Sequence, residues 1–63
     1  MMSPQEIRYF VEIAGTLNFS RAAERLGVSQ PTLTHAMNRL ESDLGIRLFH
    51  RSKQGVQLTT AGQ

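Results

Sequence analysis

The stretch FSRAAERLGVSQPTLTHAMNRLESDLG, residues 19–45, decides the fold. Each half of it has a serine near its start and a glycine at its end, and apolar residues recur at helical spacing between them. This pattern predicts a short helix over 20–26 and a longer helix over 30–44. Gly27 between them is the residue type that best tolerates the left-handed backbone of a tight turn. Two helices joined in this way form a helix-turn-helix.

The two sides of the longer helix differ in chemistry. At 3.6 residues per turn, the core-facing side is expected to carry Leu33, Ala36, Met37, Leu40 and Leu44. The opposite side is polar and carries Pro31, His35, Asn38 and Ser42, flanked by Thr34 and Arg39, with Thr32 beyond Arg39. On the shorter helix, Ala22 and Ala23 are small enough for two helices to cross closely. Ser20 and Ser29 are the expected N-caps of the two helices.

Another helix is predicted before this pair. Ser3 and Glu6 have the spacing of a capping box, and Pro4 suits the first helical position, so we expect a helix over 4–16. Its core-facing side is expected to carry Ile7, Phe10, Val11 and Ala14, with Leu17 and Phe19 continuing the core beyond the helix.

After Gly45 the apolar period changes from 3.6 toward 2, which predicts a short β-hairpin over 46–58. The alternation is expected to place Ile46, Leu48 and His50 on one face and Arg47, Phe49 and Arg51 on the other. Residues 52–55 have the composition of a turn. One face of the hairpin should pack on the helices, because an isolated hairpin is marginally stable. The expected fold is therefore mainly α, a winged helix-turn-helix of three helices and a hairpin wing.

The end of the chain carries one more helix signal. Thr60 and Gln63 have capping-box spacing, with Thr60 as the cap. We interpret residues 59–63 as the start of a truncated helix, and the chain as a piece of something longer.

Composition limits the classes of protein that the chain can represent. Its 63 residues are 40% hydrophobic and 19% charged and include no cysteine, which fits one small globular domain over 1–63. Disulfides and thiolate metal sites are therefore excluded. No apolar run approaches the ~20 residues that cross a bilayer, and no secretory signal is present. We expect a cytoplasmic protein that does not bind membranes.

Enzymatic activity is not expected. His35 and His50 lie at no metal-ligand spacing with a second histidine or a carboxylate. The chain has no nucleophile elbow and no glycine-rich phosphate loop. We expect no metal and no cofactor, and we expect His50 to be a partly covered surface residue.

The charge distribution favours a nucleic-acid partner. The formal net charge is +2 and the isoelectric point about 10.0, and an isoelectric point above ~9 is one mark of nucleic-acid binding. The excess lies in the second half, where Arg47, Arg51 and Lys53 have no acidic residue among them. Helix N-termini also attract phosphates, and two predicted N-termini lie near Ser20, Arg21 and Ser29.

Two functions compete for the polar side of the 30–44 helix. It carries no acid before Glu41, and a helix of this kind fits the major groove of DNA. The alternative is a winged-helix protein–protein interaction module that uses the same side, which an apolar surface there would favour. The small net charge of +2 disfavours sequence-independent coating of DNA, because such binders rely on many Lys/Arg–phosphate contacts.

The sequence resembles the DNA-binding domain of LysR-type transcriptional regulators. The resemblance rests on FSRAAERLGVSQPTLT (19–34), on LExxLGxxLFxR (40–51), on LTxAG (58–62) and on RYFV (8–11). It covers essentially the whole chain. It implies a bacterial regulator with an N-terminal winged helix-turn-helix, a linker helix that forms a dimer or tetramer, and a C-terminal domain that binds a small-molecule effector. Such regulators bind interrupted inverted repeats in double-stranded DNA, so this chain would be the reading head, with 59–63 as the start of the linker helix.

The resemblance also implies site residues. Gln30, Pro31, Thr34 and His35 match base-contacting positions, and Thr32 matches a position that contacts backbone or bases. Phosphate or wing contacts are expected from Ser20, Arg21, Ser29, Asn38, Arg39, Arg51, Lys53 and Gln54. Two positions depart from the family pattern. Many members carry arginine where His35 stands, and histidine is shorter and changes its charge near pH ~6.5. Many carry a basic residue that reaches the minor groove where Gln54 stands, so either Gln54, as a hydrogen-bond donor, or Lys53, as a cation, would take that role here.

Overall fold

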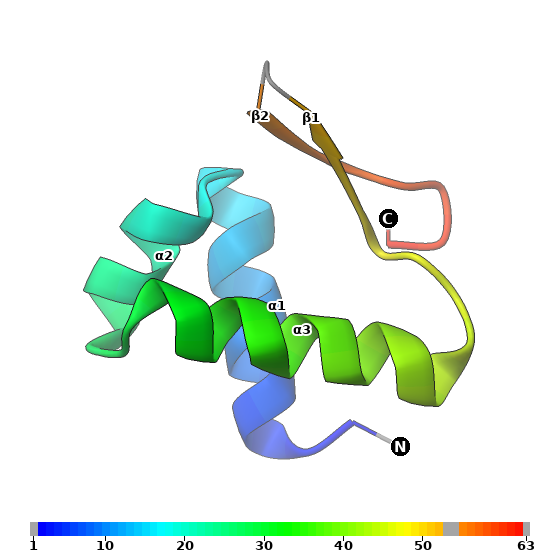
Figure 1. Ribbon diagram of the computed structural model, residues 1–63, viewed down its shortest axis with the longest axis horizontal. Helices are drawn as coiled ribbons and strands as arrows, with labels where there is room; N and C mark the ends of the chain where they lie inside the picture. Colours follow the sequence, from blue (N-terminus) through cyan, green and yellow to red (C-terminus); the bar gives the residue numbers. More distant parts are fainter. Residues whose placement is uncertain (1, 53–54, 63) are drawn as a thin grey trace.

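The computed structural model describes residues 2–52 and 55–62. Its elements are α1 (Pro4–Thr16), α2 (Phe19–Leu26), α3 (Gln30–Leu44), β1 (Phe49–Ser52) and β2 (Gly55–Leu58). Helix α3 crosses in front of α1, α2 lies beside both, and the antiparallel β1–β2 hairpin rises next to the helices (Figure 1). The predicted mainly helical fold with a hairpin wing is confirmed.

Helix α1 has the predicted bounds, but its buried side is rotated away from part of the predicted set. Ser3 and Glu6 form the expected capping box at its start. The predicted core residues Ile7 and Val11 are 47% and 58% exposed, however, while Tyr9 and Ile13 are buried. Tyr9 and Ile13 share an apolar stripe with Phe10, which is half-buried and packs against the core as predicted. This stripe contains two aromatic rings and therefore removes more apolar surface from water when it is buried.

Helix α2 starts earlier than predicted. Its N-cap is Asn18, whose side-chain oxygen accepts the backbone N–H of Arg21 at 2.9 Å. The prediction of Ser20 as the cap is therefore wrong. An asparagine caps a helix as well as a serine does, and this one stands two residues earlier. Leu17 ends α1 in the left-handed conformation and is 44% exposed, so it does not continue the core, whereas Phe19 is buried as predicted.

The turn and α3 follow the sequence pattern closely. Gly27 has the left-handed φ of +72° that was expected of it. The Ser29 hydroxyl caps α3 by accepting the backbone N–H of Thr32, and α3 ends before Gly45. Ala22 and Ala23 are buried between the helices, and Leu33, Met37 and Leu40 are buried along α3. Leu44 is 39% exposed, which contradicts its predicted place in the core.

The hairpin is shorter than predicted. Its register pairs Phe49 with Leu58 and Ser52 with Gly55, and residues 46–48 lie outside the strands. Leu48 and Phe49 are both buried, so the predicted alternation fails at this point. It fails because a side chain of α3, described below, binds the backbone N–H groups of both residues. His50 is exposed on the surface rather than partly covered.

A turn follows the hairpin at residues 60–62. The Thr59 hydroxyl accepts the backbone N–H of Gly62 at 3.2 Å, so capping geometry lies at Thr59 rather than at the predicted Thr60. The Thr59 backbone N–H donates to the Leu48 carbonyl at 3.0 Å, which ties this turn to the start of the wing. Gln63, which completes the predicted capping box, lies outside the described residues, and the helix start at 59–63 stays a prediction.

An aromatic cluster joins the wing to the helices. The Phe49 ring of β1 lies 5.4 Å from the Phe10 ring of α1 and 5.6 Å from the Phe19 ring of α2, measured between centroids. Phe49 is fully buried and Phe19 nearly so. Contacts of this kind stabilise beyond simple area burial, and they fix the hairpin against α1 and α2. None of the helices among the described residues has the length and apolar content to span a membrane.

Candidate nucleic-acid interface

The side of α3 that faces away from the core is open to solvent. Gln30, Pro31, Thr32, His35, Asn38 and Arg39 are exposed, and Thr34 is half-buried. The opposite side is held in the core by Leu33, Met37 and Leu40, each at most 2% exposed. The sequence-predicted base-contacting residues therefore all lie on the first two turns of one helix. We call this exposed polar side the outer face of α3.

The first turn of α3 holds its polar groups in fixed positions. The Ser29 hydroxyl accepts the Thr32 backbone N–H at 3.2 Å and donates to the Thr32 hydroxyl at 2.7 Å. The Thr32 oxygen is therefore used as an acceptor, which leaves its own hydroxyl proton to be donated to another acceptor. Ser29, which was also predicted to contact phosphate, is the N-cap of α3.

Helix α2 adds a second polar terminus. Ser20 and Arg21 are exposed in its first turn, as expected for phosphate contacts. Asn18 accepts the Arg21 backbone N–H, so one of the free amides of this terminus is already satisfied. Within residues 2–52 and 55–62, Arg21 forms no salt bridge, whereas Arg25 at the other end of α2 pairs with Glu12.

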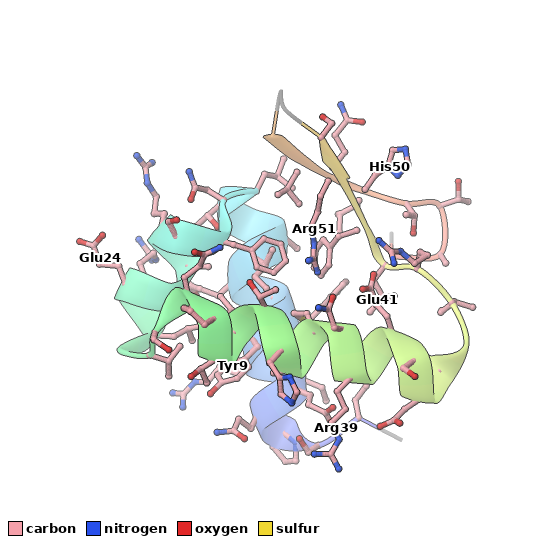
Figure 2. All side chains as sticks on the ribbon, viewed as in Figure 1. Tyr9, Glu24, Arg39, Glu41, His50 and Arg51 are labelled. Carbon is pink, nitrogen blue, oxygen red and sulfur yellow. The ribbon has the colours of Figure 1, made fainter. Side chains whose placement is uncertain are left out.

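Arg39 extends from α3 toward the start of α1 (Figure 2). A groove there is lined by residues of both helices, among them Ser3, Glu6, His35 and Arg39. The pKa of Glu6 is lowered, first because the Ser3 backbone N–H and hydroxyl donate to its capping-box carboxylate, and further because Arg39 is nearby. The Arg39 side chain itself is exposed, which leaves it available to an anion.

The junction between α3 and the wing contains a buried acid, Glu41, that is 5% exposed. Its Oε2 accepts the backbone N–H groups of Leu48 at 2.7 Å and Phe49 at 3.2 Å. Arg47 and Arg51 lie 3.9 and 3.8 Å from the carboxylate. Sequence reasoning missed this role. The available signal was spacing, since Glu41 stands four residues after the buried Met37 and therefore on the same side of α3.

Arg51 of β1 lies between the hairpin and α3, above Glu41 (Figure 2). Its Nη2 donates to the Asn38 side-chain oxygen at 3.2 Å, and its guanidinium carbon lies 4.4 Å from the centre of the Phe19 ring. The Arg51 side chain is 30% exposed. Two predicted wing residues, Lys53 and Gln54, lie outside the described residues.

Comparison with known proteins places this geometry among solved DNA-binding domains. Residues 4–63 match the family described as "Bacterial regulatory helix-turn-helix protein, lysR family". The HTH-type transcriptional regulator BudR of Klebsiella aerogenes is 47% identical over 62 residues, which are 98% of this chain and 43% of BudR. The CbnR DNA-binding domain in its crystal structure with DNA has a TM-score of 0.91 and 46% identity over 97% of this chain and 70% of that one.

A second DNA complex has the same fold. The BenM DNA-binding domain bound to catB site 1 DNA has a TM-score of 0.92 and 36% identity over 97% of this chain and 68% of that one. The chain thus spans most of these isolated domains. It spans only 43% of BudR and about a fifth, 21%, of several other curated relatives.

Proposed function

This chain belongs to the LysR family of bacterial regulatory helix-turn-helix proteins, and from this premise we propose that it is the part of a transcriptional regulator that reads the sequence of double-stranded DNA. One observation carries the proposal. The outer face of α3 is exposed and polar over its first two turns, while the opposite side of the helix is held in the core by Leu33, Met37 and Leu40. The DNA complexes of the similar CbnR and BenM domains support it.

The side chains on this face match the chemistry of base edges in the major groove. Gln30 can bind an adenine edge through both its donor and its acceptor, and the Thr32 and Thr34 hydroxyls and the His35 ring can donate or accept. Pro31 offers an apolar surface to a thymine methyl group. We propose these five residues as the base contacts.

Phosphate contacts would orient the helix in the groove. We propose Ser20, Arg21, Ser29 and Arg39 for this role, because they lie exposed at two helix N-termini or beside the outer face. Asn38 stands on the same side of α3. Arg51 is left out of this set, since its guanidinium already contacts Glu41, Asn38 and Phe19. Lys53 and Gln54, which lie outside the described residues, remain proposed DNA contacts.

The intact protein is proposed to be longer and oligomeric. The chain covers less than half of its curated relatives, which leaves room for a linker helix and an effector-binding domain. A dimer with two-fold symmetry would bind an interrupted inverted repeat, and a regulator of bacterial genes would act in the cytoplasm.

The protein-interaction alternative receives no support from the outer face of α3. Among the described residues, the large exposed apolar side chains are Ile7, Val11, Leu17, Leu44 and Ile46. Ile7 and Val11 lie on α1, and Leu17 follows it. Leu44 is the last residue of α3, and Ile46 lies beyond it. None lies in the first turns of α3, where a partner protein would need them.

Selection from a randomised duplex pool tests the proposed function. The chain would be fused to an unrelated dimerising helix, because joining two half-site readers raises affinity by ~10²–10⁴. We expect enrichment of an interrupted inverted repeat. A folded fusion that enriches no sequence would overturn the proposal.

A further inference from the structure

The Arg51 guanidinium is held by three elements at once. Nη2 lies 3.8 Å from Oε1 of Glu41 and donates to Asn38 Oδ1 at 3.2 Å, both on α3. The guanidinium also stacks over the ring of Phe19 on α2, while its own backbone belongs to β1. A basic residue of a wing is usually free to reach phosphate. Arg51 instead contacts both α3 and α2, at the junction between the wing and the helices.

Glu41 explains why Arg51 stays in this position. The carboxylate is buried, and its Oε1 has no hydrogen-bond partner among the described residues. Two backbone N–H groups and Arg47 stabilise the charge from the side of Oε2, and Arg51 is the cation that faces Oε1. If Arg51 moved out to a phosphate, this oxygen would lose its counter-charge and the Phe19 ring would lose its cover. Uncompensated buried charge is costly.

The contact with Arg51 fixes the orientation of the Asn38 amide. Arginine has only donors, so the oxygen of Asn38 must point toward Arg51. The amide NH₂ group is then left on the outer face of α3, one turn after Thr34 and His35. Asn38 is exposed there, and the NH₂ group that it presents can only donate.

We infer that Arg51 is a positioning residue, which holds Asn38 as a one-way hydrogen-bond donor to an acceptor atom on DNA. This inference rests on the proposed function. DNA offers such acceptors as phosphate oxygens and, in the major groove, as N7 and O6 of guanine, N7 of adenine and O4 of thymine. Adenine N6 and cytosine N4 are donors and are disfavoured opposite Asn38.

A double-mutant cycle tests the coupling. The wild-type chain, Asn38→Ala, Arg51→Met and the double variant would be compared as dimerising-helix fusions, on the duplex enriched by selection. Since a hydrogen bond contributes ~0.5–1.5 kcal/mol, we expect Asn38→Ala to weaken wild-type binding by about 3- to 10-fold. In the Arg51→Met background, where the amide is free to turn, the same change should weaken binding by less than about 2-fold. Equal factors in the two backgrounds would overturn the inference.

Salt dependence separates positioning from direct phosphate contact. A lost phosphate contact lowers the slope of log K against log salt by about one. We expect Arg51→Met to leave that slope unchanged, while Arg39→Ala lowers it. A drop of about one for Arg51→Met would make Arg51 a phosphate ligand and contradict the inference.

The source of the acceptor follows from Asn38→Ala on duplexes changed one base pair at a time. If Asn38→Ala loses the same affinity on every duplex, the acceptor is a phosphate oxygen. If the loss of affinity vanishes on the duplex with one particular changed base pair, the acceptor is on that base. Unchanged binding on every duplex would overturn the inference.

If Arg51→Met does not fold, Arg51→Lys replaces it in the double-mutant cycle with the same two outcomes. Lysine keeps the charge but lacks the planar fork that reaches both Glu41 and Asn38. Failure of the wild-type chain to select any sequence would instead refute the proposed function.

Discussion

Glu41 near the end of α3 accepts the backbone N–H of Leu48 at 2.7 Å, and this bond ties the wing to the helix that precedes it. The same oxygen accepts the N–H of Phe49, the first residue of β1. Both N–H groups belong to buried residues. This buried carboxylate therefore helps to hold the wing in its position relative to the outer face of α3, together with the aromatic cluster around Phe49.

Glu41→Ala is expected to destabilise the domain by about 2–4 kcal/mol, because it leaves two buried N–H donors without an acceptor. For a domain of this size, each kcal/mol lowers the melting temperature by about 4–8 °C. Thermal and urea unfolding would measure the loss. Glu24→Ala is the matched control, since Glu24 is an exposed acid on α2 and its removal should change stability by less than about 0.5 kcal/mol. Equal stability of the two variants would contradict the role of Glu41.

Much of the fold follows from signals that are local in sequence. Ser3 with Glu6, Ser29, Gly27 and Gly45 each act within one turn of the chain, and the bounds that depend on them agree with the structure. Where two nearby residues can both cap a helix, the sequence alone does not decide between them. At the start of α2, Ser20 was predicted but Asn18 is the cap. Neighbouring caps differ little in intrinsic preference, so tertiary packing decides between them.

Features that depend on distant partners could not be predicted in this way. Part of the buried side of α1 packs on a distant residue, since Phe10 contacts Phe49 from the other end of the sequence. The contact of Arg51 with Asn38 joins residues 13 positions apart, and no periodicity encodes it. The outer face of α3 could be predicted because it needs only helix geometry and one apolar side.

Gly27→Val is expected to cost about 1–3 kcal/mol, because a β-branched residue resists a φ of +72°. Among the described residues, and apart from Gly27 and its two chain neighbours, no atom lies within 4 Å of an added Cβ at Gly27, so the cost is backbone strain rather than a clash. Gly15 is the control. It is helical, also has open space around it, and Gly15→Ala should stabilise the domain by about 0.5–1 kcal/mol. A melting temperature for Gly27→Val that matches wild type would refute the strain.

Acid should weaken the start of α1. The folded-state pKa of Glu6 lies below its ordinary value of 4.5, first because Ser3 donates to it. A carboxylate of this kind stabilises the fold above its unfolded pKa, and the stabilisation is lost as pH falls through the lower folded value. Glu6→Gln keeps an acceptor for the Ser3 N–H and should unfold with less dependence on pH below 4.5. Identical acid profiles for wild type and Glu6→Gln would argue against this linkage.

Thr34→Ala and His35→Ala are expected to relax sequence choice. Each removes a polar group from the outer face of α3, and a good base-edge contact discriminates by about 1–3 kcal/mol. Affinities for the selected duplex and for a scrambled duplex would be compared. The prediction fails if both variants keep the wild-type ratio of the two affinities.

Arg39→Ala should weaken binding to all sequences alike and lower the salt slope by about one, because a phosphate contact carries no sequence information. Arg25→Ala changes the net charge by the same amount. Arg25 lies at the far end of α2, however, and is paired with Glu12 of α1. Its salt slope should stay close to wild type. Matching slopes for the two variants would show that net charge, not a contact at Arg39, is responsible.

The most direct test of the account is an NMR titration of the ¹⁵N-labelled chain with the selected duplex and with a shuffled duplex of the same composition. We expect the backbone amide shifts to concentrate in residues 30–39 and to be larger for the selected duplex. Shifts confined to the exposed side of α1 around Ile7 and Val11, or equal for the two duplexes, would contradict the claim that the outer face of α3 reads the sequence.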